Sequence, residues 1–385
     1  MSQEVGQAAS AWEELAVRLA CPETVCPPEF RDVSDAVSYL RSVLGEDYLE
    51  GARKIRKHPF VGLLSISWPG LRSDFLNWVA HVRGVRQCQN VDRVIGDLRV
   101  ANKCIHAYGM IEIGGRLRRS GLNVFFEPES GRNEFPFRPD ARIDFPTTGE
   151  SFFLELSCQW LAERQLGAFE AMGACHEPVR MHLETLKCSF RLRTIPAPDH
   201  MEEIVQRIEE AAQTVLLTGH HAEVVENGTL EMGICHRKNS EELDMWRTRH
   251  AIHFEGYEGP RDDTHEIDRL KQKIRREQRQ LPQEYPNVLA IENDHIFSHY
   301  PDVRHLISAL QEEVYKYRNL AFILVQGSNG SNRGEAGEVI TQGEHRFQRS
   351  VGQGHVRHTL LLSNRYVEQK PSDKLRTLLA EALFD

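Results

Sequence analysis

Three short runs of alternating side chains, spaced by turn-forming residues, most constrain the fold of this 385-residue chain. They read LNVFFEPE, PDARIDF and SFFLELSC, and they follow a helical segment that ends in basic residues and Gly121. Alternation with a period of two is typical of strands with one buried face, and Pro, Gly, Asn and Thr between the runs are typical of turns. The sequence therefore predicts a helix followed by three consecutive strands.

The last third of the chain alternates strands with helices. NVLAIEN and LAFILVQ have the apolar character of buried strands, DVRHLISALQEEVYKY between them has helical periodicity, and RHTLLLSNRYV reads as a last strand. Such alternation favours an α/β sheet with a parallel component.

Two domains are expected at this length. Residues 1–98 carry apolar residues at helical spacing and predict a helical N-terminal domain. An α/β domain is then expected over 99–385, with a mainly helical insertion at about 160–280. Within the insertion, residues 215–262 are ambiguous between helix and strand.

Composition narrows the class of protein. No apolar run is long enough to span a membrane, and the N-terminus is acidic rather than basic and apolar, so we expect a cytoplasmic protein without a membrane partner. The eight scattered cysteines suit free thiols in a reducing compartment. With 47 Lys and Arg against 56 Asp and Glu, the net charge of −9 argues against a protein that coats nucleic acid, but it allows a local basic groove.

The second and third predicted strands each carry an acidic face. In PDARIDF, Asp140 and Arg142 share a face, and in SFFLELSC, Glu155 and Ser157 do so. If the two strands pair as a hairpin, Asp140 and Glu155 point at the same volume. Two close carboxylates are unfavourable unless they are protonated or bridged by a cation, and oxygen ligands suit Mg²⁺ or Mn²⁺. The alternative, which periodicity alone favours, is a solvent-facing polar sheet surface.

A third acid lies in the preceding helix. Glu112 falls near the apolar stripe that Tyr108 and Gly115 share, and a glutamate there needs a partner. It is either a further ligand of the same cation or the partner of Arg116, four residues later on the helix.

The order of these parts resembles the PD-(D/E)XK nuclease family, which has the restriction-endonuclease-like fold. The resemblance rests on Glu112, on Pro139–Asp140 and on FFLELS, with LNVFFEPE between, and it covers about residues 99–370. It implies a mixed sheet flanked by helices, and Mg²⁺ (or Mn²⁺) held by Asp140 and Glu155 with Glu112 in support. It also implies a nuclease that hydrolyses phosphodiester bonds in nucleic acid, with DNA favoured over RNA by analogy alone.

One family position departs from the pattern. In the family, a lysine two residues after the glutamate helps to position and deprotonate the attacking water, but Ser157 stands there in this chain. Arg142 or Arg116 could supply the charge instead, or Gln159 could orient a water molecule. Otherwise the site is inactive, and the fold acts as a nucleic-acid-binding or protein-interaction module. Whether the chain is an enzyme therefore depends on what replaces the lysine.

Basic residues gather in two helical segments. RLKQKIRREQR contains one glutamate among many cations, and GGRLRRSG lies next to the predicted carboxylates. Both could contact phosphates, although a solvated helix face is an equal alternative for the first. The candidate nucleic-acid-binding residues are Arg116, Arg119, Lys271, Lys273, Arg275 and Arg276. Nucleic acid is thus the expected partner, and a homodimer is a further candidate assembly.

Overall fold

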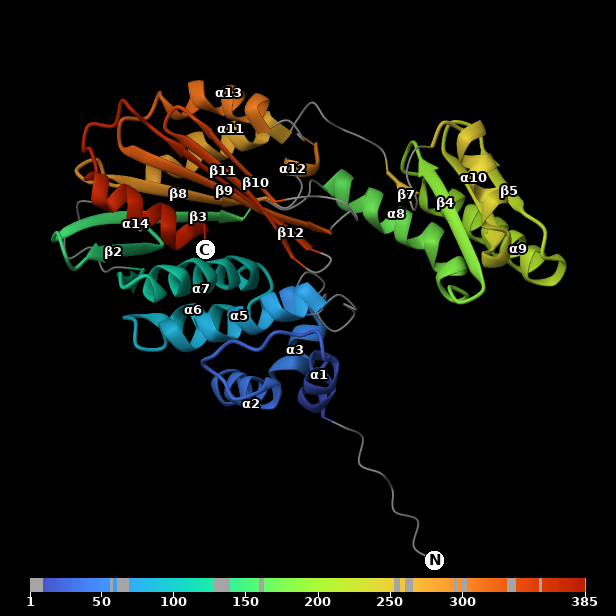
Figure 1. Cartoon of the computed structure of the whole chain (residues 1–385), viewed down its shortest axis with the longest axis horizontal. Helices are drawn as coiled ribbons and strands as arrows, with labels where there is room; N and C mark the ends of the chain where they lie inside the picture. The colour runs from blue at the N-terminus through green and yellow to red at the C-terminus, as the bar shows by residue number, and fades with distance from the viewer. Residues whose placement is uncertain are drawn as a thin grey trace, which may run out of the picture. The chain divides into compact units, whose positions relative to one another are not determined.

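The structure of the chain is a computed structural model (Figure 1). It describes residues 10–55, 58–60, 69–127, 139–158, 163–252, 257–259, 266–293, 296–299, 303–330, 337–352 and 355–384. The chain divides into two compact units. Unit 1 combines Met1–Trp160 with His265–Asp385, and unit 2 is Leu161–Thr264.

Unit 1 contains an eight-stranded mixed sheet with the order β1-β2-β3-β8-β9-β12-β11-β10. The first three strands pair antiparallel, β3, β8 and β9 run parallel, and the last three strands are again antiparallel. The strands are β1 (Asn123–Phe126), β2 (Ala141–Phe145), β3 (Glu150–Cys158), β8 (Asn287–Glu292), β9 (Leu320–Gly330), β10 (Glu338–Gln342), β11 (His345–Gly352) and β12 (His355–Ser363). The predicted α/β class, with a large mixed sheet flanked by helices and a parallel component, is confirmed.

The register of β2 against β3 follows the alternation in the sequence. Ala141 lies opposite Leu154 and Ile143 opposite Phe152, and all four side chains are buried. The residues one step beyond the Ala141 pair are Asp140 and Glu155. The hairpin thus brings the two acids to the same end of the strand pair, as the sequence predicted.

Helices cover both faces of the sheet (Figure 1). One apolar cluster joins the sheet to α7, α5 and α14, and the other joins it to α11 and α13. The helices of unit 1 are α1 (Ala11–Leu19), α2 (Val33–Leu44), α3 (Tyr48–Arg53), α5 (Pro69–Val85), α6 (Val91–Asp97), α7 (Cys104–Arg119), α11 (Glu266–Glu277), α12 (Ile296–His299), α13 (Val303–Val314) and α14 (Asp373–Phe384), with the 3₁₀ turn η2 (Gln278–Gln280) after α11.

The N-terminal helices share the core of the sheet. Trp12 of α1, Leu40 of α2 and Trp78 of α5 belong to the same buried cluster as Leu154 of β3. Sequence analysis assigned residues 1–98 to a domain of their own, whereas the structure includes these helices in unit 1. The physical reason is that α5 packs along α7, so the apolar faces of the N-terminal helices are buried against the α/β part rather than among themselves alone.

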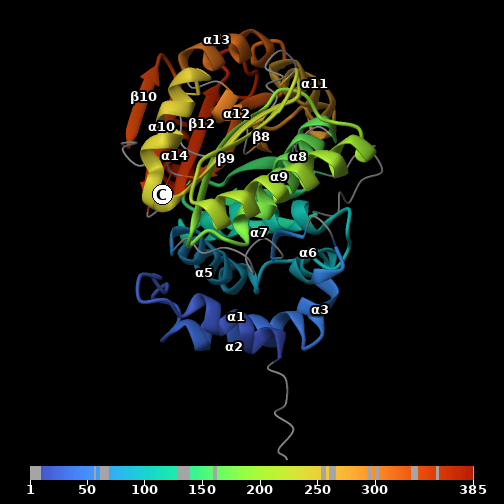
Figure 2. The ribbon, with the colours of Figure 1, turned by 90° about the vertical axis from the view of Figure 1, so that its right-hand side faces the viewer.

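Unit 2 has a sheet and a core of its own, and Figure 2 shows α8 and α9 side by side in it. The strand order is β5-β6-β4-β7, with α8 and α9 packed on one face and α10 on the other. Its elements are α8 (Glu163–Arg180), β4 (Leu186–Leu192), α9 (Pro198–Thr218), β5 (Ala222–Glu226), β6 (Leu230–His236), η1 (Arg237–Asn239), α10 (Ser240–Arg249) and β7 (Tyr257–Glu258). The described part of the insertion has more residues in helices than in strands, and the ambiguous segment 215–262 supplies three of its four strands.

Two predictions from composition concern the whole chain. All eight cysteines are free thiols, as expected. Among the described helices, none has both the length and the apolar character that crossing a membrane requires.

Candidate functional site

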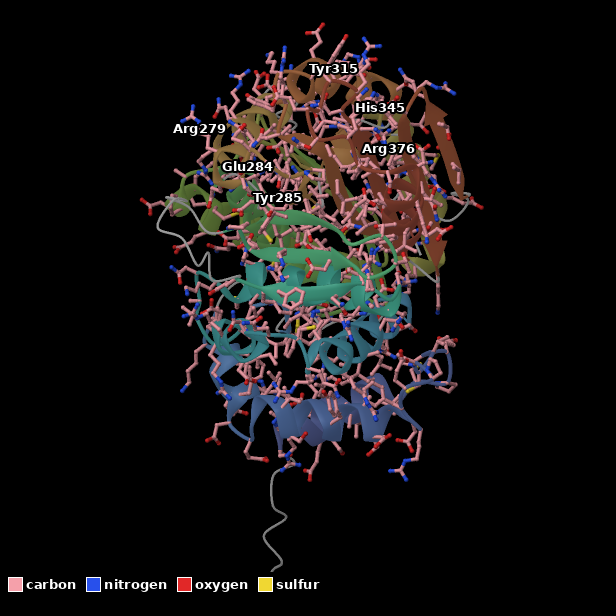
Figure 3. All side chains as sticks on the ribbon, turned by 90° about the vertical axis from the view of Figure 1, so that its left-hand side faces the viewer. Arg279, Glu284, Tyr285, Tyr315, His345 and Arg376 are labelled. Carbon is pink, nitrogen blue, oxygen red and sulfur yellow. The ribbon has the colours of Figure 1, made fainter. Side chains whose placement is uncertain are left out.

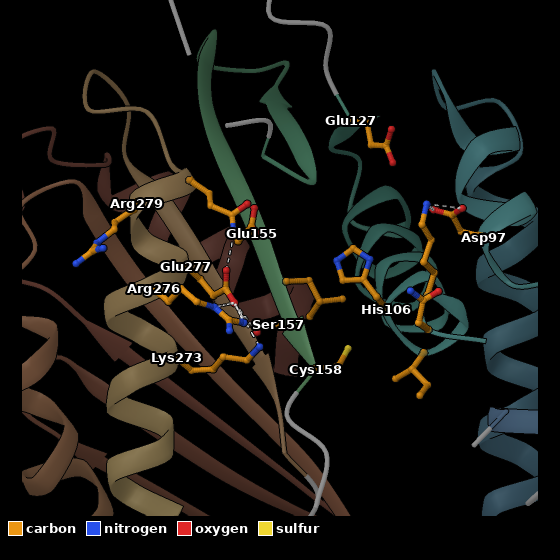
Figure 4. Close-up of a pocket in the computed structure, with 15 residues that line it drawn as sticks. Asp97, His106, Glu127, Glu155, Ser157, Cys158, Lys273, Arg276, Glu277 and Arg279 are labelled. Carbon is orange, nitrogen blue, oxygen red and sulfur yellow. Dashed lines mark hydrogen bonds and ion pairs between the residues drawn. The ribbon is translucent and has the colours of Figure 1, made fainter. Parts of the chain in front are cut away.

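A pocket of ≈820 Å³ opens in unit 1 at the carboxyl end of β3 (Figure 4). One wall is formed by β3 and α11, and the other by α7 and the segment between α6 and α7. Four carboxylates and four cationic side chains lie around it. The lining residues are Asp97, Asn102, Lys103, Ile105, His106, Glu127, Glu155, Leu156, Ser157, Cys158, Lys273, Arg276, Glu277, Arg279 and Gln280.

Asp140 is fixed beside this pocket by contacts from two directions. Its Oδ2 accepts a hydrogen bond of 2.8 Å from the backbone N–H of Leu156 and lies 3.0 Å from Nε2 of His106 on α7. Burial alone would lower the pKa of His106, but the hydrogen bond and charge of Asp140, with the charge of Glu292, raise it. The Asp140 side chain is therefore held in place by contacts with both β3 and α7.

Glu155 is buried within β3, with 5% of its surface exposed. Burial raises its pKa to about 10, the charges of Asp140 and Glu277 add to the rise, and the backbone N–H of Asp140 and the charge of Lys273 oppose it. Its Oε2 accepts no hydrogen bond from any described residue. A buried carboxyl with an unpaired oxygen beside a second carboxylate is a group that a cation would stabilise in its charged form.

The wall made by α11 places cations beside Glu155. The Glu277 carboxylate, 5% exposed, lies 3.3 Å from Nζ of Lys273 and 2.6 Å from Nη2 of Arg276. The hydroxyl of Ser157 donates to the same carboxylate over 3.4 Å. Burial would raise the pKa of Glu277, but the hydrogen bonds and charges of Arg276 and Lys273 lower it. Ser157 is thus hydrogen-bonded to Glu277 of α11, the helix that also carries Lys273.

Glu112 does not join the two acids. Its Oε1 accepts from Nη2 of Arg116 at 2.6 Å and from the guanidinium of Arg357 on β12, and it does not line the pocket. The pairing with Arg116 that the spacing allowed is the one observed. Glu112 lies six residues after His106 on α7, and its partner from the sheet, Arg357, is on β12 rather than on β2 or β3. The prediction of Glu112 as a ligand beside Asp140 and Glu155 therefore does not match its observed partners.

Two of the candidates for replacing the missing lysine are engaged elsewhere. Arg142 forms an ion pair of 3.0 Å with Asp144 and lies over the ring of Phe125 at 4.5 Å, and it does not line the pocket. Arg116 is 7% exposed and bound to Glu112. Gln159, the third candidate, lies outside the described residues.

The predicted nucleic-acid-binding residues separate into two groups. Lys273 and Arg276 line the pocket. Arg275 instead forms two hydrogen bonds with Glu313 of α13, at 2.8 and 2.9 Å, and Arg119 pairs with Glu29. Arg116 is buried, and Lys271 does not line the pocket. A basic run in sequence is therefore not a single basic surface, because a helix points its cations in different directions.

Most of the residues that line the pocket were not among the predicted site residues, and the charged ones include His106, Lys103, Arg279 and Glu277. His106 and Lys103 precede the glutamate that drew attention to α7, and no spacing rule connects them to Asp140. Arg279 belongs to the basic segment, and its exposed side chain points outward at the edge of the protein (Figure 3). Glu277 was visible as the one acid in a basic run, four residues after Lys273, which is the spacing of a helical ion pair.

The donor set fits a weakly coordinated Mg²⁺ better than a closed metal site. Among the described residues, no group of three or more His, Cys, Asp and Glu side chains is arranged to hold a metal ion. Mg²⁺ is often bound by only one or two carboxylates, with water and substrate phosphate completing its shell. Asp140 and Glu155, with the unpaired Oε2 of Glu155, match that pattern.

No protein-family model matches this chain, and no curated protein is similar to it at a significant level.

Proposed function

We propose that this chain is a divalent-metal-dependent phosphodiesterase that acts on nucleic acid. The observation that carries the proposal is the buried Glu155, whose Oε2 accepts no hydrogen bond from any described residue, next to Asp140 in the β2–β3 pair and in a pocket that lysine and arginine also line. The carboxylates can bind a metal ion, and the lysine and arginine side chains can bind the phosphates of a nucleic acid. Such a combination suits a site where a metal ion and a phosphodiester are bound together. DNA is favoured over RNA by family analogy alone.

The order of elements supports the same family resemblance. A helix, three antiparallel strands and then two strands parallel to the third follow one another as α7, β1, β2, β3, β8 and β9. The two acids occur at the carboxyl end of β3, which is where sheets with parallel strands bind ligands. The restriction-endonuclease-like fold is therefore the fold that we propose for unit 1.

In this proposal Asp140 and Glu155 hold Mg²⁺ or Mn²⁺. The bound ion would acidify a water molecule and polarise a phosphoryl oxygen. Other residues of the protein orient the ligands and attract the substrate. His106 and the N–H of Leu156 orient the Asp140 carboxylate, and the exposed cations Arg276 and Arg279 attract the phosphates next to the scissile one.

A second candidate function is favoured by Ser157. Because the strand carries no cation at this position, the pocket could bind nucleic acid without cleaving it. In that case the same arginines would account for binding, and substitution of the two acids would leave binding unchanged or would strengthen it, since negative charge would be removed.

Cleavage assays with matched variants separate the two functions. Purified protein is incubated with single- and double-stranded DNA and with RNA, in Mg²⁺ or Mn²⁺, and Mn²⁺ binding is measured by calorimetry. We expect Asp140→Asn and Glu155→Gln each to lower the rate by about 10²–10³-fold, because each removes an anionic ligand of the metal ion that stabilises the transition state. Both should also weaken Mn²⁺ binding.

The control is Glu284→Gln, which makes the same chemical change at an exposed glutamate outside the pocket (Figure 3). It should cleave and bind Mn²⁺ like the wild type. If the wild type and the Asp140→Asn, Glu155→Gln double variant show the same rate and the same Mn²⁺ affinity, the phosphodiesterase proposal is wrong. Binding without cleavage in all proteins would favour the second function.

A further inference from the structure

One face of α11 and η2 is turned toward the acidic face of β3. Arg276 and Glu277 each lie three or four residues from both Lys273 and Gln280, so these residues share a side of the helix, and all four line the pocket. The β3 residues opposite them are Glu155 and Ser157, which are both buried. The helix therefore presents its cations to the strand position that lacks one.

Glu277 holds this face in place. Its carboxylate contacts Nζ of Lys273 at 3.3 Å, the guanidinium of Arg276 at 2.6 Å, the hydroxyl of Ser157 at 3.4 Å and the amide of Gln280. A buried carboxylate is stable only when it has such partners. Glu277 therefore holds the ammonium group of Lys273 in a fixed position. The side chain of Lys273 is 23% exposed, so its ammonium group can be reached from the pocket.

Lys273 and Glu155 line the same pocket, and the Glu277 carboxylate that contacts Lys273 also accepts from Ser157, two residues after Glu155 on β3. The strand-borne alternative Arg142 is bound to Asp144, and Arg116 is bound to Glu112. Arg276, which also touches Glu277, has a side chain that is 68% exposed, against 23% for Lys273. Lys273 is thus the more enclosed of the two cations beside the carboxylates.

We propose that Lys273 of α11 supplies the active-site positive charge that a lysine at position 157 would otherwise supply, and that Glu277 and Ser157 are its positioning residues. The inference rests on the proposed phosphodiesterase function and names a further catalytic residue for it. Ser157 then has a role of its own and is more than the absence of a lysine. Its hydroxyl group donates a hydrogen bond from β3 to the Glu277 carboxylate, which orients Lys273.

The chemistry requires only a fixed charge. In hydrolysis the water oxygen bonds to phosphorus, the P–O bond to the leaving oxygen breaks, one water proton ends on that oxygen and the other passes to solvent. Lys273 neither gains nor loses a proton over the reaction. Its ammonium group stabilises the negative charge that develops on the phosphoryl oxygens, which is a task for a preorganised cation in a partly buried site.

The experiment compares Lys273→Met with Lys370→Met, which removes the same charge at an exposed site outside the pocket. We expect Lys273→Met to lower the cleavage rate by about 10²–10³-fold. Its Mn²⁺ affinity should stay within about threefold of the wild type, because both proposed ligands remain. In EDTA, without cleavage, Lys273→Met should bind a single-stranded oligonucleotide more weakly and with a smaller salt dependence than Lys370→Met.

Relocation of the charge gives the sharpest result. The Ser157→Lys, Lys273→Met double variant should regain at least about tenfold over Lys273→Met, and Lys273→Arg should retain part of the rate since it keeps the charge. Glu277→Gln should lower the rate on its own but add little to Lys273→Met, because the two act as a unit. A structural role for Glu277 would instead give effects that add.

Two outcomes overturn the proposal, and they differ from each other. If Lys273→Met cleaves at the wild-type rate while Glu155→Gln is inactive, Lys273 is not the cation but the phosphodiesterase function stands. If the folded wild type cleaves neither DNA nor RNA, both proposals are wrong. Circular dichroism of each variant identifies any that has failed to fold, and Lys273→Arg then provides the comparison.

Discussion

Ser157 and Gly115 show how single residues decide local geometry in this chain. The hydroxyl of Ser157 is 3.4 Å from Glu277, so the residue connects β3 with α11. Gly115 lies where α7 crosses α5, and its missing side chain leaves room for the His81 backbone and ring. In both cases the residue matters through an element that is distant in sequence.

The glycine leads to a prediction about stability. Gly115→Ala should lower the free energy of unfolding by about 2 to 3 kcal/mol, because the added methyl group would meet Cα of His81 at 2.7 Å and the two helices would have to separate. Urea unfolding followed by circular dichroism measures the change.

Gly84→Ala is the matched control, since Gly84 is on α5 itself and a methyl group there meets no atom within 4 Å. It should raise the free energy of unfolding by about 0.5–1 kcal/mol through helix propensity. Equal effects of the two substitutions would show that α5 and α7 are not in close contact at Gly115.

Helix α11 has two separate roles at the scale of elements. Toward β3 it carries the pocket cations, and toward α13 it is fastened through Arg275, whose guanidinium binds Glu313. Glu313 also accepts from Lys316 and from the hydroxyl of Tyr317. A substitution at Arg275 would therefore disturb the packing of α11, and it would report on nucleic-acid binding only indirectly.

Glu313 gives a prediction with a defined pH dependence. The hydrogen bond from Arg275, with those from Lys316 and Tyr317, outweighs burial and lowers the pKa of Glu313 to about 2. Because the folded pKa is below the unfolded one, the stabilisation is complete above about pH 4.5 and is lost as the pH falls toward about 2. Glu313→Gln should cost about 1–2 kcal/mol at neutral pH, since the partners are half exposed.

Urea unfolding at about pH 7, 4.5 and 3.5 tests this sign, because the gap between the wild type and Glu313→Gln should narrow as the pH falls. Glu312→Gln, a neighbouring substitution on the same helix, should show a smaller gap at every pH. A gap that widened toward acid would contradict the assignment of Glu313 as a charged partner of Arg275.

At the scale of the whole molecule, the chain forms two compact units, of which unit 1 is discontinuous in sequence and unit 2 is a single segment. Unit 1 is made of two segments, and unit 2 is inserted between β3 and α11. Unit 2 has its own four-stranded sheet, with buried side chains on both faces. A unit with a core of its own is expected to fold alone.

We therefore predict that a Leu161–Thr264 fragment unfolds in one cooperative transition in urea. Phe190→Ala in the fragment should lower its stability by about 3 kcal/mol, because that ring is fully buried in the core. Leu217→Ala, at a side chain that is 85% exposed, should change it little. A fragment with no cooperative transition would show that unit 2 depends on the rest of the chain.

The parts of the fold that were predictable are those with local patterns. Alternation in PDARIDF and SFFLELSC predicted the apolar faces that β2 and β3 bury and the placement of Asp140 and Glu155 at the same end of the strand pair, but not the burial of Glu155 and Ser157. The antiparallel edge β10–β11, the helix α14 and the strand β4 were missed, and the segment that holds β5, β6 and β7 was ambiguous, since their alternation is weaker and their burial depends on neighbours far away in sequence. The described part of residues 1–98 forms helices as predicted, but they share a core with the α/β part because α5 packs along α7.

The sequence by itself determined the α/β class, the hairpin that carries Asp140 and Glu155, and the absence of a cation at position 157. Each of these follows from the spacing of residues that are close together in the chain. Only the tertiary structure decided the partners. Glu112 accepts a hydrogen bond from Arg357 of β12. Lys273 lines the same pocket as Glu155, although its helix α11 begins only after unit 2 in the sequence. Charges interact through space and not along the chain, so the partner of a buried acid is settled only when distant elements have packed.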